Sequence, residues 1–264
     1  MTQLSVNVNK VATLRNTRPL NIPSVLHCAK LALDAGAHGI TVHPRPDHRH
    51  IRPDDVTDLA ALLKHYPHAE FNIEGNPFLD YMPHIRNIGG SGPTQCTLVP
   101  DSTEQFTSDH GWSLTPDTCK QLAPLIVEMK HLGCRVSLFM DASPLDAPAS
   151  QFEIAKQLGA DRIELYTEPY ARAFDQGGSA LEASLTQYIT AAQHAHALGL
   201  ALNAGHDLNL HNLPLLLQHI PTLAEVSIGH ALIADALEFG LPTTVKKYLA
   251  AIDSRQTKPS EPQS

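Results

Sequence analysis

The sequence has no long hydrophobic run, and this absence excludes several classes of protein. In its 264 residues, no stretch approaches the ~18 consecutive apolar residues that a membrane-spanning helix requires. The first residues, MTQLSVNVNK, lack the basic segment and apolar run of a secretory signal peptide. Hydrophobic residues make up 42% and charged residues 17%, as in ordinary globular proteins. We therefore expect a cytoplasmic protein with no membrane partner.

Positive charge and cysteine are also scarce. The formal net charge is -8, whereas a general nucleic-acid binder is normally basic, so we expect no nucleic-acid partner. The four cysteines, Cys28, Cys96, Cys119 and Cys134, show no CxxC spacing. We interpret them as reduced core thiols, not as disulfide partners or zinc ligands.

One pattern recurs along the chain: a helix-like segment ends in glycine, and a short apolar strand follows and stops at a polar or charged residue. It occurs at 31–45, 127–141, 155–168 and 195–206. The continuous apolar runs are typical of parallel strands covered on both faces. The glycines just past the predicted helices, where a positive φ is needed, are Gly36, Gly133, Gly159 and Gly199. Weaker strand candidates are 4–8, 69–75, 95–100 and 225–230.

Helical patterns lie between these strands, at 54–66, from Thr115-Pro116 to about His131, and over roughly 178–197. Strands alternating with helices over about 250 residues predict an α/β fold, a (β/α)₈ TIM barrel with one catalytic domain over 1–252. A doubly wound open sheet is the alternative, but no GxGxxG follows the first strand.

Three segments are predicted to lie outside regular structure. The loops at 101–114 and 168–178 are long, and long loops at the strand ends of a barrel are often lids. The last residues, 253–264, have nothing apolar to bury, so we expect a disordered tail.

Polar and charged side chains stand where the predicted strands end. In a TIM barrel these ends meet at one mouth, where the functional groups collect. The residues at the strand ends are Asn7, Asn9, His43, Arg45, Glu74, Asp141, Glu164, His206 and His230. A single strand-end histidine is more often a structural residue than a catalyst, but three of them with several acids indicate an acid–base site.

The segment HPRPDHRHIRP at 43–53 is rich in arginine and histidine, and its three prolines predict a loop. Arginine and histidine donors can clamp phosphate oxygens, so one interpretation is an anion site. A solvated surface loop is an alternative, and a metal site built from His43, His48 and His50 is another.

Further anion-binding features lie elsewhere at the same mouth. Arg15 and Arg18 follow the first strand and form a second candidate phosphate clamp. Gly205-His206 and Gly229-His230 end the last two strands, where barrel enzymes often hold phosphate with backbone N–H groups. Two anion sites at one mouth predict a substrate with two phosphates, or two phosphorylated substrates.

These residues are part of a wider resemblance. In order along the chain, between about Leu4 and Ala250, stand SVNVNKVATLRNTR, GITVHPRPDHRHI, FNIEG, TLVPDSTEQFTSDHGW, VSLFMD, LNAGHDLNLHN and SIGHALI. Together they resemble the pyridoxine 5′-phosphate synthase family of bacterial vitamin B6 biosynthesis. The resemblance implies a TIM barrel with extra helices, a homo-octamer, and no metal or organic cofactor. It also implies condensation of 1-deoxy-D-xylulose 5-phosphate with 3-amino-2-oxopropyl phosphate to pyridoxine 5′-phosphate, phosphate and water.

The resemblance also assigns roles to individual residues. It implies that His43 and Glu74 are general bases, that His206 is the proton donor, and that Glu164 stabilises charge during the reaction. The residues implied to bind substrate are Asn7, Asn9, Lys10, Arg18, Arg45, His50, Thr107, Asp207, Gly229 and His230. Of these, Arg45, His50 and Thr107 resemble ligands of the pentulose phosphate.

The chain departs from the commoner family pattern at two places. Many members have aspartate and histidine where this chain has Asn9-Lys10, and many have glycine at Asp207. Two other functions are open: a metal-dependent barrel hydrolase or isomerase acting on a phosphorylated sugar, and a non-catalytic phosphometabolite-binding protein. Binding alone needs no acid–base set, so the residues favour an enzyme.

Overall fold

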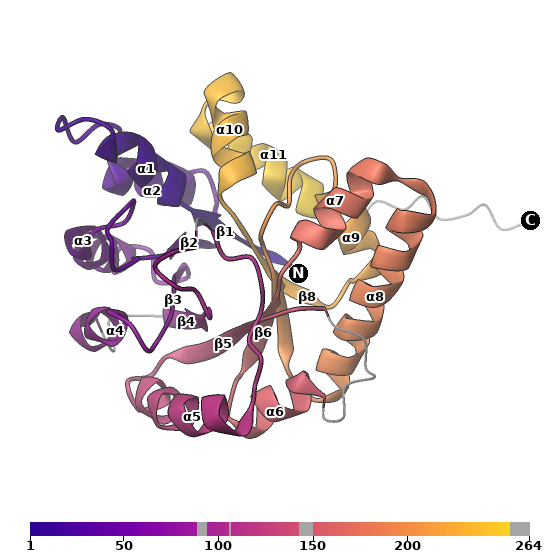
Figure 1. Cartoon of the computed structure of the whole chain (residues 1–264). Helices are drawn as coiled ribbons and strands as arrows, with labels where there is room; N and C mark the ends of the chain where they lie inside the picture. Colours follow the sequence, from indigo (N-terminus) through magenta and orange to yellow (C-terminus); the bar gives the residue numbers. More distant parts are fainter. Residues whose placement is uncertain (89–93, 106, 143–149, 254–264) are drawn as a thin grey trace, which may run out of the picture.

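The chain forms a closed barrel of eight parallel strands with helices on its outside (Figure 1). The computed structural model describes residues 1–88, 94–105, 107–142 and 150–253. The strands follow one another round the barrel in sequence order, and the last pairs with the first. They are β1 (Gln3–Asn7), β2 (Gly39–Val42), β3 (Glu70–Gly75), β4 (Thr94–Leu98), β5 (Arg135–Met140), β6 (Arg162–Leu165), β7 (Ala201–Ala204) and β8 (Leu223–Ile228). The predicted TIM barrel is confirmed, and the doubly wound sheet is wrong.

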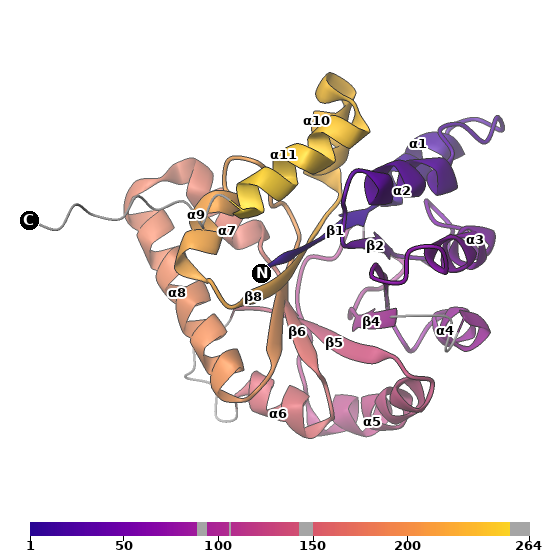
Figure 2. The same cartoon turned by 180° about the vertical axis from the view of Figure 1, so that it is seen from behind.

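Helices follow every strand, and two of them follow each of β1, β6 and β8, which accounts for the expected extra helices. In the described residues they are α1 (Asn9–Asn16), α2 (Val25–Asp34), α3 (Pro53–Leu63), α4 (Met82–Ile88), α5 (Pro116–His131), α6 (Gln151–Gln157), α7 (Glu168–Gln176), α8 (Gly178–Ala197), α9 (Leu213–His219), α10 (His230–Phe239) and α11 (Leu241–Asp253). Figures 1 and 2 place α1 to α4 along one side of the barrel and α7 and α8 on the opposite side.

The predicted helix ends are confirmed where their signals are strong. The four glycines past the helices all have positive φ, from 67° to 105°. Thr115 caps α5, because its side chain accepts a hydrogen bond from the Thr118 N–H at 3.2 Å. The prediction of a loop at 168–178 is wrong, since Glu168–Gln176 forms α7. Its buried Tyr170 and Ala173 are three residues apart and share one face, a spacing that indicates a helix.

Asp253, where the sequence predicts the start of a disordered tail, is still part of α11. Residues 254–264 lie outside the described residues. All four cysteines are free, as expected. Cys96 and Cys134 are buried, whereas Cys28 and Cys119 are only half-buried, so the expectation of core thiols is confirmed for two of them.

The strands are buried on both faces, but their two faces differ in chemistry. Outward residues such as Val6, Ile40 and Leu138 belong to the apolar core under the helices. Inward residues form a polar network instead: Asn72 donates to Thr41 at 3.3 Å, and Thr97 donates to Asn72 at 2.9 Å. The prediction of continuous apolar strands is therefore wrong in detail, because polar residues that point inward alternate with apolar residues that point outward.

The lower end of the barrel, where the strands begin, is closed by paired charges. Arg162 donates to Glu225 at 2.8 Å and to Asn203 at 3.1 Å. Arg135 pairs with Glu70 on the same layer. Buried charges are tolerated when they are paired in this way. The charged groups at the opposite end, where the strands stop, form the candidate site.

Candidate active site

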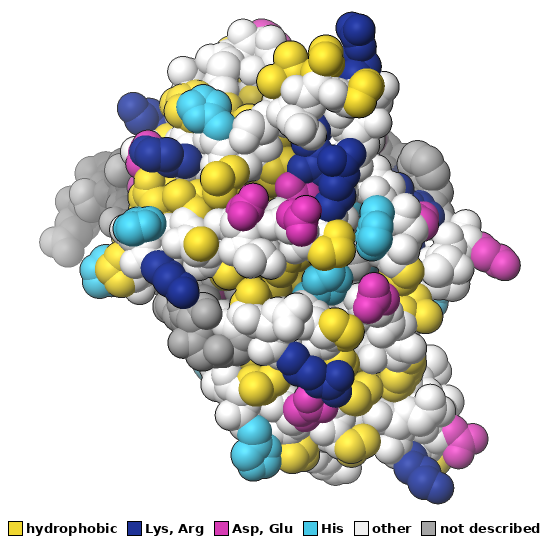
Figure 3. Space-filling model, turned by 90° about the vertical axis from the view of Figure 1, so that its left-hand side faces the viewer, with side chains coloured by type: hydrophobic (Ala, Val, Ile, Leu, Met, Phe, Trp, Pro, Cys, Tyr) yellow, Lys and Arg dark blue, Asp and Glu magenta, His cyan; other side chains and the backbone are white. Residues whose placement is uncertain are grey.

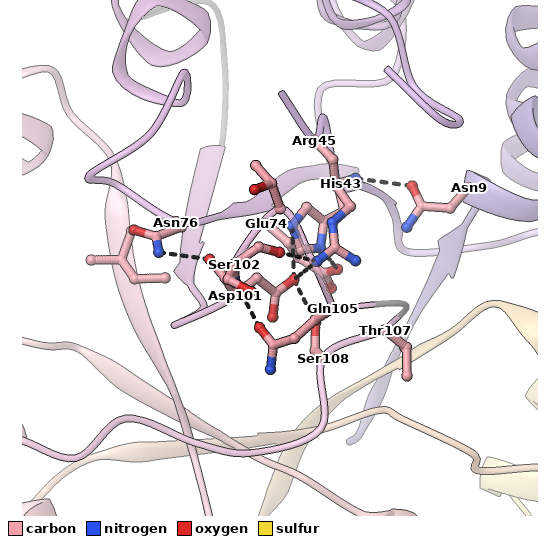
Figure 4. A network of polar contacts seen from close by, with 12 residues as sticks. Asn9, His43, Arg45, Glu74, Asn76, Asp101, Ser102, Gln105, Thr107 and Ser108 are labelled. Atoms are coloured by element: carbon pink, nitrogen blue, oxygen red, sulfur yellow. Dashed lines mark hydrogen bonds and ion pairs between the residues drawn. The ribbon is translucent and has the colours of Figure 1, made fainter. Parts of the chain in front are cut away.

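His43 directly follows β2 and lies between two carboxylates (Figure 4). Its ring Nδ1 is 3.6 Å from Glu74 Oε2, and its Nε2 is 3.5 Å from Asp101 Oδ2. The His43 backbone N–H donates to the Asn9 side chain at 2.9 Å, which ties the start of this loop to the start of α1. The ring is 6.2 Å from that of His50, measured between centroids.

Burial decides the protonation of these groups. Burial, together with the positive charges of Arg45 and Arg49, lowers the pKa of His43 to about 3. Burial likewise raises the pKa of Glu74 well above its ordinary value, and the nearby Glu164 adds to the increase. His43 is therefore neutral near pH 7 and able to accept a proton, and Glu74 is a stronger base than an exposed glutamate.

Asp101 is the site residue that the sequence reasoning missed. It stands two residues after Val99, in the loop that leaves β4, and its exposed fraction is 3%. Its Oδ2 accepts from Arg45 at 3.1 Å and from the Ser108 hydroxyl at 3.0 Å. The signal was available, because Asp101 follows the end of a predicted strand as the other site residues do.

A second cluster surrounds His206, which follows β7. Its Nε2 is 2.9 Å from the Thr107 hydroxyl, and its Nδ1 is 3.0 Å from Asp207 Oδ2. The Tyr166 ring lies edge-on to the imidazole at 5.3 Å. Asp207 has a φ of 64°, a region that favours glycine. Hydrogen bonding from His206 lowers the pKa of Asp207.

Glu164 lies inside the barrel, within β6 and not at its end as predicted. Burial and the nearby Glu225 charge, opposed by Arg162, raise its pKa to about 8. Its Oε2 has no hydrogen-bond partner among the described residues. A side chain at Gly205 would meet Glu164 Oε1 at 2.8 Å and the Ser227 carbonyl at 2.7 Å, so glycine is required beside this carboxyl.

The two predicted arginine clamps differ. In the loop after β2, Arg45 is buried against Asp101, and Arg49 donates to the Gln105 carbonyl at 2.9 Å. After β1, Arg15 pairs with Asp55 inside the protein, so its contacts are structural. Arg18 is exposed, and its backbone N–H donates to the Arg15 carbonyl at 3.4 Å.

The remaining candidates lie where β1 meets β8. The Asn7 side chain accepts from the Asn9 N–H at 2.9 Å. Gly229 lies against Asn7, since a Cβ at Gly229 would be 3.1 Å from the Asn7 side chain. His230, expected at a strand end, is the first residue of α10. An electrostatic interaction with His230 contributes to the lowered pKa of Asp207, so these two side chains lie near each other.

Lys10 is half-buried in the first turn of α1. Its charge contributes to lowering the pKa of both His50 and Asp207, so it lies near a residue of each cluster. We expect Lys10→Ala to raise KM for a phosphorylated substrate by about tenfold, because one phosphate-directed charge is lost. Steady-state kinetics at two ionic strengths test this: the effect weakens as salt rises. A collapsed kcat with unchanged KM would instead place Lys10 in the chemistry.

The described residues contain no group of three or more His, Cys, Asp or Glu side chains arranged to hold a metal ion, so His43, His48 and His50 do not form the metal site considered above. Within the same ranges, no helix combines the length and the hydropathy needed to cross a membrane. A pocket is lined by His43, Arg45, Asn76, Asp101 and Ser102, among others.

A closed (β/α)₈ barrel whose acids and histidines gather where the strands end is the architecture of a TIM-barrel enzyme. The sequence model of the family described as "Pyridoxal phosphate biosynthesis protein PdxJ" matches residues 4–254, and the chain belongs to this family.

Relatives agree with this assignment. The chain is 54% identical over 253 residues to the pyridoxine 5′-phosphate synthase of Albidiferax ferrireducens, covering 95% of this chain and 97% of that one. It is 50% identical over 253 residues to the enzyme of the same name from Chelativorans sp., covering 96% and 99%.

Solved structures share the fold at low sequence identity. The tryptophan synthase alpha chain of Legionella pneumophila superposes with a TM-score of 0.64 at 13% identity, covering 97% of this chain and 94% of that one. The 3-hexulose-6-phosphate synthase of Salmonella typhimurium gives 0.59 at 14% identity, covering 96% and 100%. At such identities, the likeness concerns the barrel alone.

Proposed function

We propose that the protein is a pyridoxine 5′-phosphate synthase, which condenses 1-deoxy-D-xylulose 5-phosphate with 3-amino-2-oxopropyl phosphate to pyridoxine 5′-phosphate, phosphate and water. One observation supports this proposal independently of family membership. Strands and loops from opposite sides of the barrel bring two histidine–carboxylate groups to one mouth: His43 with Glu74, and His206 with Asp207. The condensation needs several proton transfers in both directions, and such a pair of groups can supply them.

Each step of the reaction moves a proton. The amine adds to the pentulose ketone, water leaves to give an imine, and a proton is removed next to that imine. Phosphate and water are eliminated, and one water adds back to give the hydroxymethyl group of the product. Ring closure onto the second carbonyl is followed by dehydration, so the net by-products are one phosphate and two waters. We propose that His43 and Glu74 take the protons, because one is neutral and the other has a raised pKa. His206 then returns a proton, and Glu164 stabilises positive charge once it is ionised.

The substrates are held by groups around these four. We propose that the pentulose phosphate binds Arg45, His50 and Thr107, and that Lys10 adds positive charge. The proposal is supported by position, since Arg45 lines the pocket beside His43 and Thr107 contacts His206. The other residues proposed to contact substrate are Asn7, Asn9, Arg18, Asp207, Gly229 and His230.

We also propose a cytoplasmic homo-octamer that uses neither metal nor organic cofactor. Several large hydrophobic side chains near α1 and α2 are exposed, among them Leu14 at 53%, Leu20 at 53% and Ile22 at 65%. On the face drawn in Figure 3, hydrophobic side chains lie between charged ones. Exposed apolar groups of this kind support association with further copies of the chain.

The decisive experiment supplies both phosphorylated substrates to the purified protein. We expect pyridoxine 5′-phosphate and inorganic phosphate to form in equal amounts, detected by absorbance and by phosphate release. Omitting either substrate should abolish both signals. Phosphate release without pyridoxine 5′-phosphate would contradict the proposal and indicate a phosphatase.

A metal-dependent reaction predicts a different response to chelation. We expect the rate of pyridoxine 5′-phosphate formation to stay within about twofold of the untreated enzyme after exhaustive chelation, because proton transfers by side chains carry the chemistry. The measurement compares initial rates before and after dialysis against a chelator. Loss of activity that one added metal restores would overturn this expectation.

A further inference from the structure

One oxygen of Asp101 joins the base of the site to its phosphate-binding arginine. Asp101 Oδ2 lies 3.1 Å from Arg45 Nη2, 3.5 Å from His43 Nε2 and 3.0 Å from the Ser108 hydroxyl (Figure 4). The first and third distances are those of hydrogen bonds, whereas 3.5 Å is too long for a good one. This oxygen therefore accepts hydrogen bonds from Arg45 and Ser108, and His43 Nε2 is the next donor in distance.

The place of Asp101 is fixed by its surroundings. Its side chain is 4% exposed, and its backbone carbonyl accepts from the Asn76 amide at 2.8 Å. The neighbouring carbonyl, that of Ser102, accepts a second bond from Arg45 at 3.0 Å. Arg45, Asp101 and His43 all line the same pocket. A ligand entering this pocket meets the guanidinium of Arg45 beside the imidazole of His43.

A phosphate at Arg45 would change the charge that His43 experiences. In the free protein, burial and the positive charges of Arg45 and Arg49 keep the pKa of His43 at about 3. A base this weak removes a proton slowly, because its driving force is small. A phosphate dianion offsets the two arginine charges and so raises the basicity of His43. The titratable and charged groups that face His43 are Arg45, Asp47, Arg49, His50, Glu74 and Asp101.

We propose that Asp101 is a positioning residue that couples phosphate binding to the base: when a substrate phosphate engages Arg45, Asp101 Oδ2 is released from that arginine and accepts a hydrogen bond from His43 Nε2. The proposal rests on the proposed function, since it takes the pentulose phosphate as the ligand of Arg45.

The proton on Nε2 stays there, shared with Asp101. His43 Nδ1 then carries the lone pair, and this atom faces Glu74 at 3.6 Å. Asp101 thus sets the tautomer in which a proton can pass between Glu74 and His43. The phosphate does more than hold the substrate, because its binding energy prepares the base for the step that follows.

The test compares Asp101→Asn with the parent enzyme. The amide keeps the shape but removes the charge that would hold the Nε2 proton. We expect kcat to fall about 10²-fold with KM for the pentulose phosphate rising less than tenfold. The pH at which kcat reaches half its maximum should also move. Asp101→Glu restores the charge and should recover at least about tenfold of the lost kcat.

Asp109→Asn is the matched control. Asp109 lies in the same loop, but its side chain is 56% exposed and pairs with His110. Its variant should keep kcat, KM and the pH profile of the parent. If Asp109→Asn matched Asp101→Asn, the effect would reflect loop charge in general, and the proposal would be wrong.

A measurement on the unaltered protein does not depend on how the variants fold. With ¹⁵N-labelled histidine, the His43 signal is assigned by its loss in His43→Gln and titrated with pH. Adding 1-deoxy-D-xylulose 5-phosphate should raise the pH of half-titration by at least about one, and unphosphorylated 1-deoxy-D-xylulose should not. An unmoved titration with bound phosphate would overturn the proposal.

Failure of this inference is distinct from failure of the proposed function. If the parent enzyme forms no pyridoxine 5′-phosphate, the proposed function is wrong whatever Asp101 does. If it forms the product and Asp101→Asn changes only KM, Asp101 merely supports Arg45 and the coupling is wrong.

Discussion

Alanine at His43, glutamine at Glu74 or alanine at His206 should each lower kcat at least ~10²-fold, the usual effect of losing one acid or base. His43 and Glu74 form one pair at 3.6 Å, and His206 forms a second group with Thr107. We propose that the two groups act on different proton transfers, so we expect that neither replaces the other. The measurement is kcat for pyridoxine 5′-phosphate formation with both substrates saturating.

The pH profile separates Glu74 from the histidines. Glu74 must be ionised to act as a base, and burial raises its pKa. Activity of the parent enzyme should therefore increase with pH through this raised pKa, and the increase should be missing in Glu74→Gln. His131→Ala, on the exposed side of α5, is the control and should keep the parent kcat. Near-normal turnover in any of the three variants would remove that residue from the mechanism.

The barrel was predictable because its signals are local. A glycine that needs a positive φ marks a helix end, and Gly36, Gly133 and Gly159 fulfil that role in the structure. The helix at 168–176 was missed for the opposite reason. Glu168 and Pro169 begin α7 directly after β6, and the segment has only two buried residues, Tyr170 and Ala173, to indicate a helix.

The polar interior of the barrel could not be read from strand composition. Ser5 and Thr41 lie on adjacent strands and their hydroxyls are 2.7 Å apart, but each is surrounded in sequence by apolar neighbours. Only the register of the closed sheet turns them to the same side. The same register aligns Phe139 with Glu164, and thus places a carboxyl inside the barrel where the sequence predicted a strand end.

The candidate site was predictable in its residues more than in its contacts. The position after a strand identified His43 and His206, because all strands of a parallel barrel end at one mouth. Which groups meet there depends on loops. The loop after β4 brings Asp101 to His43 and Thr107 to His206, although its sequence has no pattern that fixes its path. Tertiary structure alone determines these two contacts.

Glutamine at Glu164 should lower kcat about 10²-fold and, at the same time, stabilise the fold at pH 8. The first effect follows because an amide cannot ionise to stabilise positive charge. The second follows from burial: the pKa of Glu164 is about 8 in the folded chain, against 4.5 for an exposed glutamate. A site that raises the pKa of this carboxyl so far lowers the stability of the fold at pH 8. We propose that the role of Glu164 in the reaction explains why the carboxyl is kept there.

The sign of the pH dependence follows from proton counting. Between pH 4.5 and about 8, the folded chain keeps the Glu164 proton and the unfolded chain has lost it. The free energy of unfolding therefore falls as pH rises, by about 1.4 kcal/mol per pH unit from this group, and this contribution is fully present only below pH 4.5. Glutamine does not titrate, so the advantage of Glu164→Gln over the parent should grow steadily across this range.

Chemical denaturation of both proteins at several pH values between 5.5 and 8 measures this difference. Glu128→Gln is the control, because the side chain of Glu128 on α5 is 36% exposed and Arg86 lowers its pKa, so its variant should show no such growing advantage. A constant difference between Glu164→Gln and the parent would mean that Glu164 is already ionised in the folded chain. Its buried carboxylate would then be balanced by Arg162, and the acid would serve the charged layer at the base of the barrel instead of the reaction.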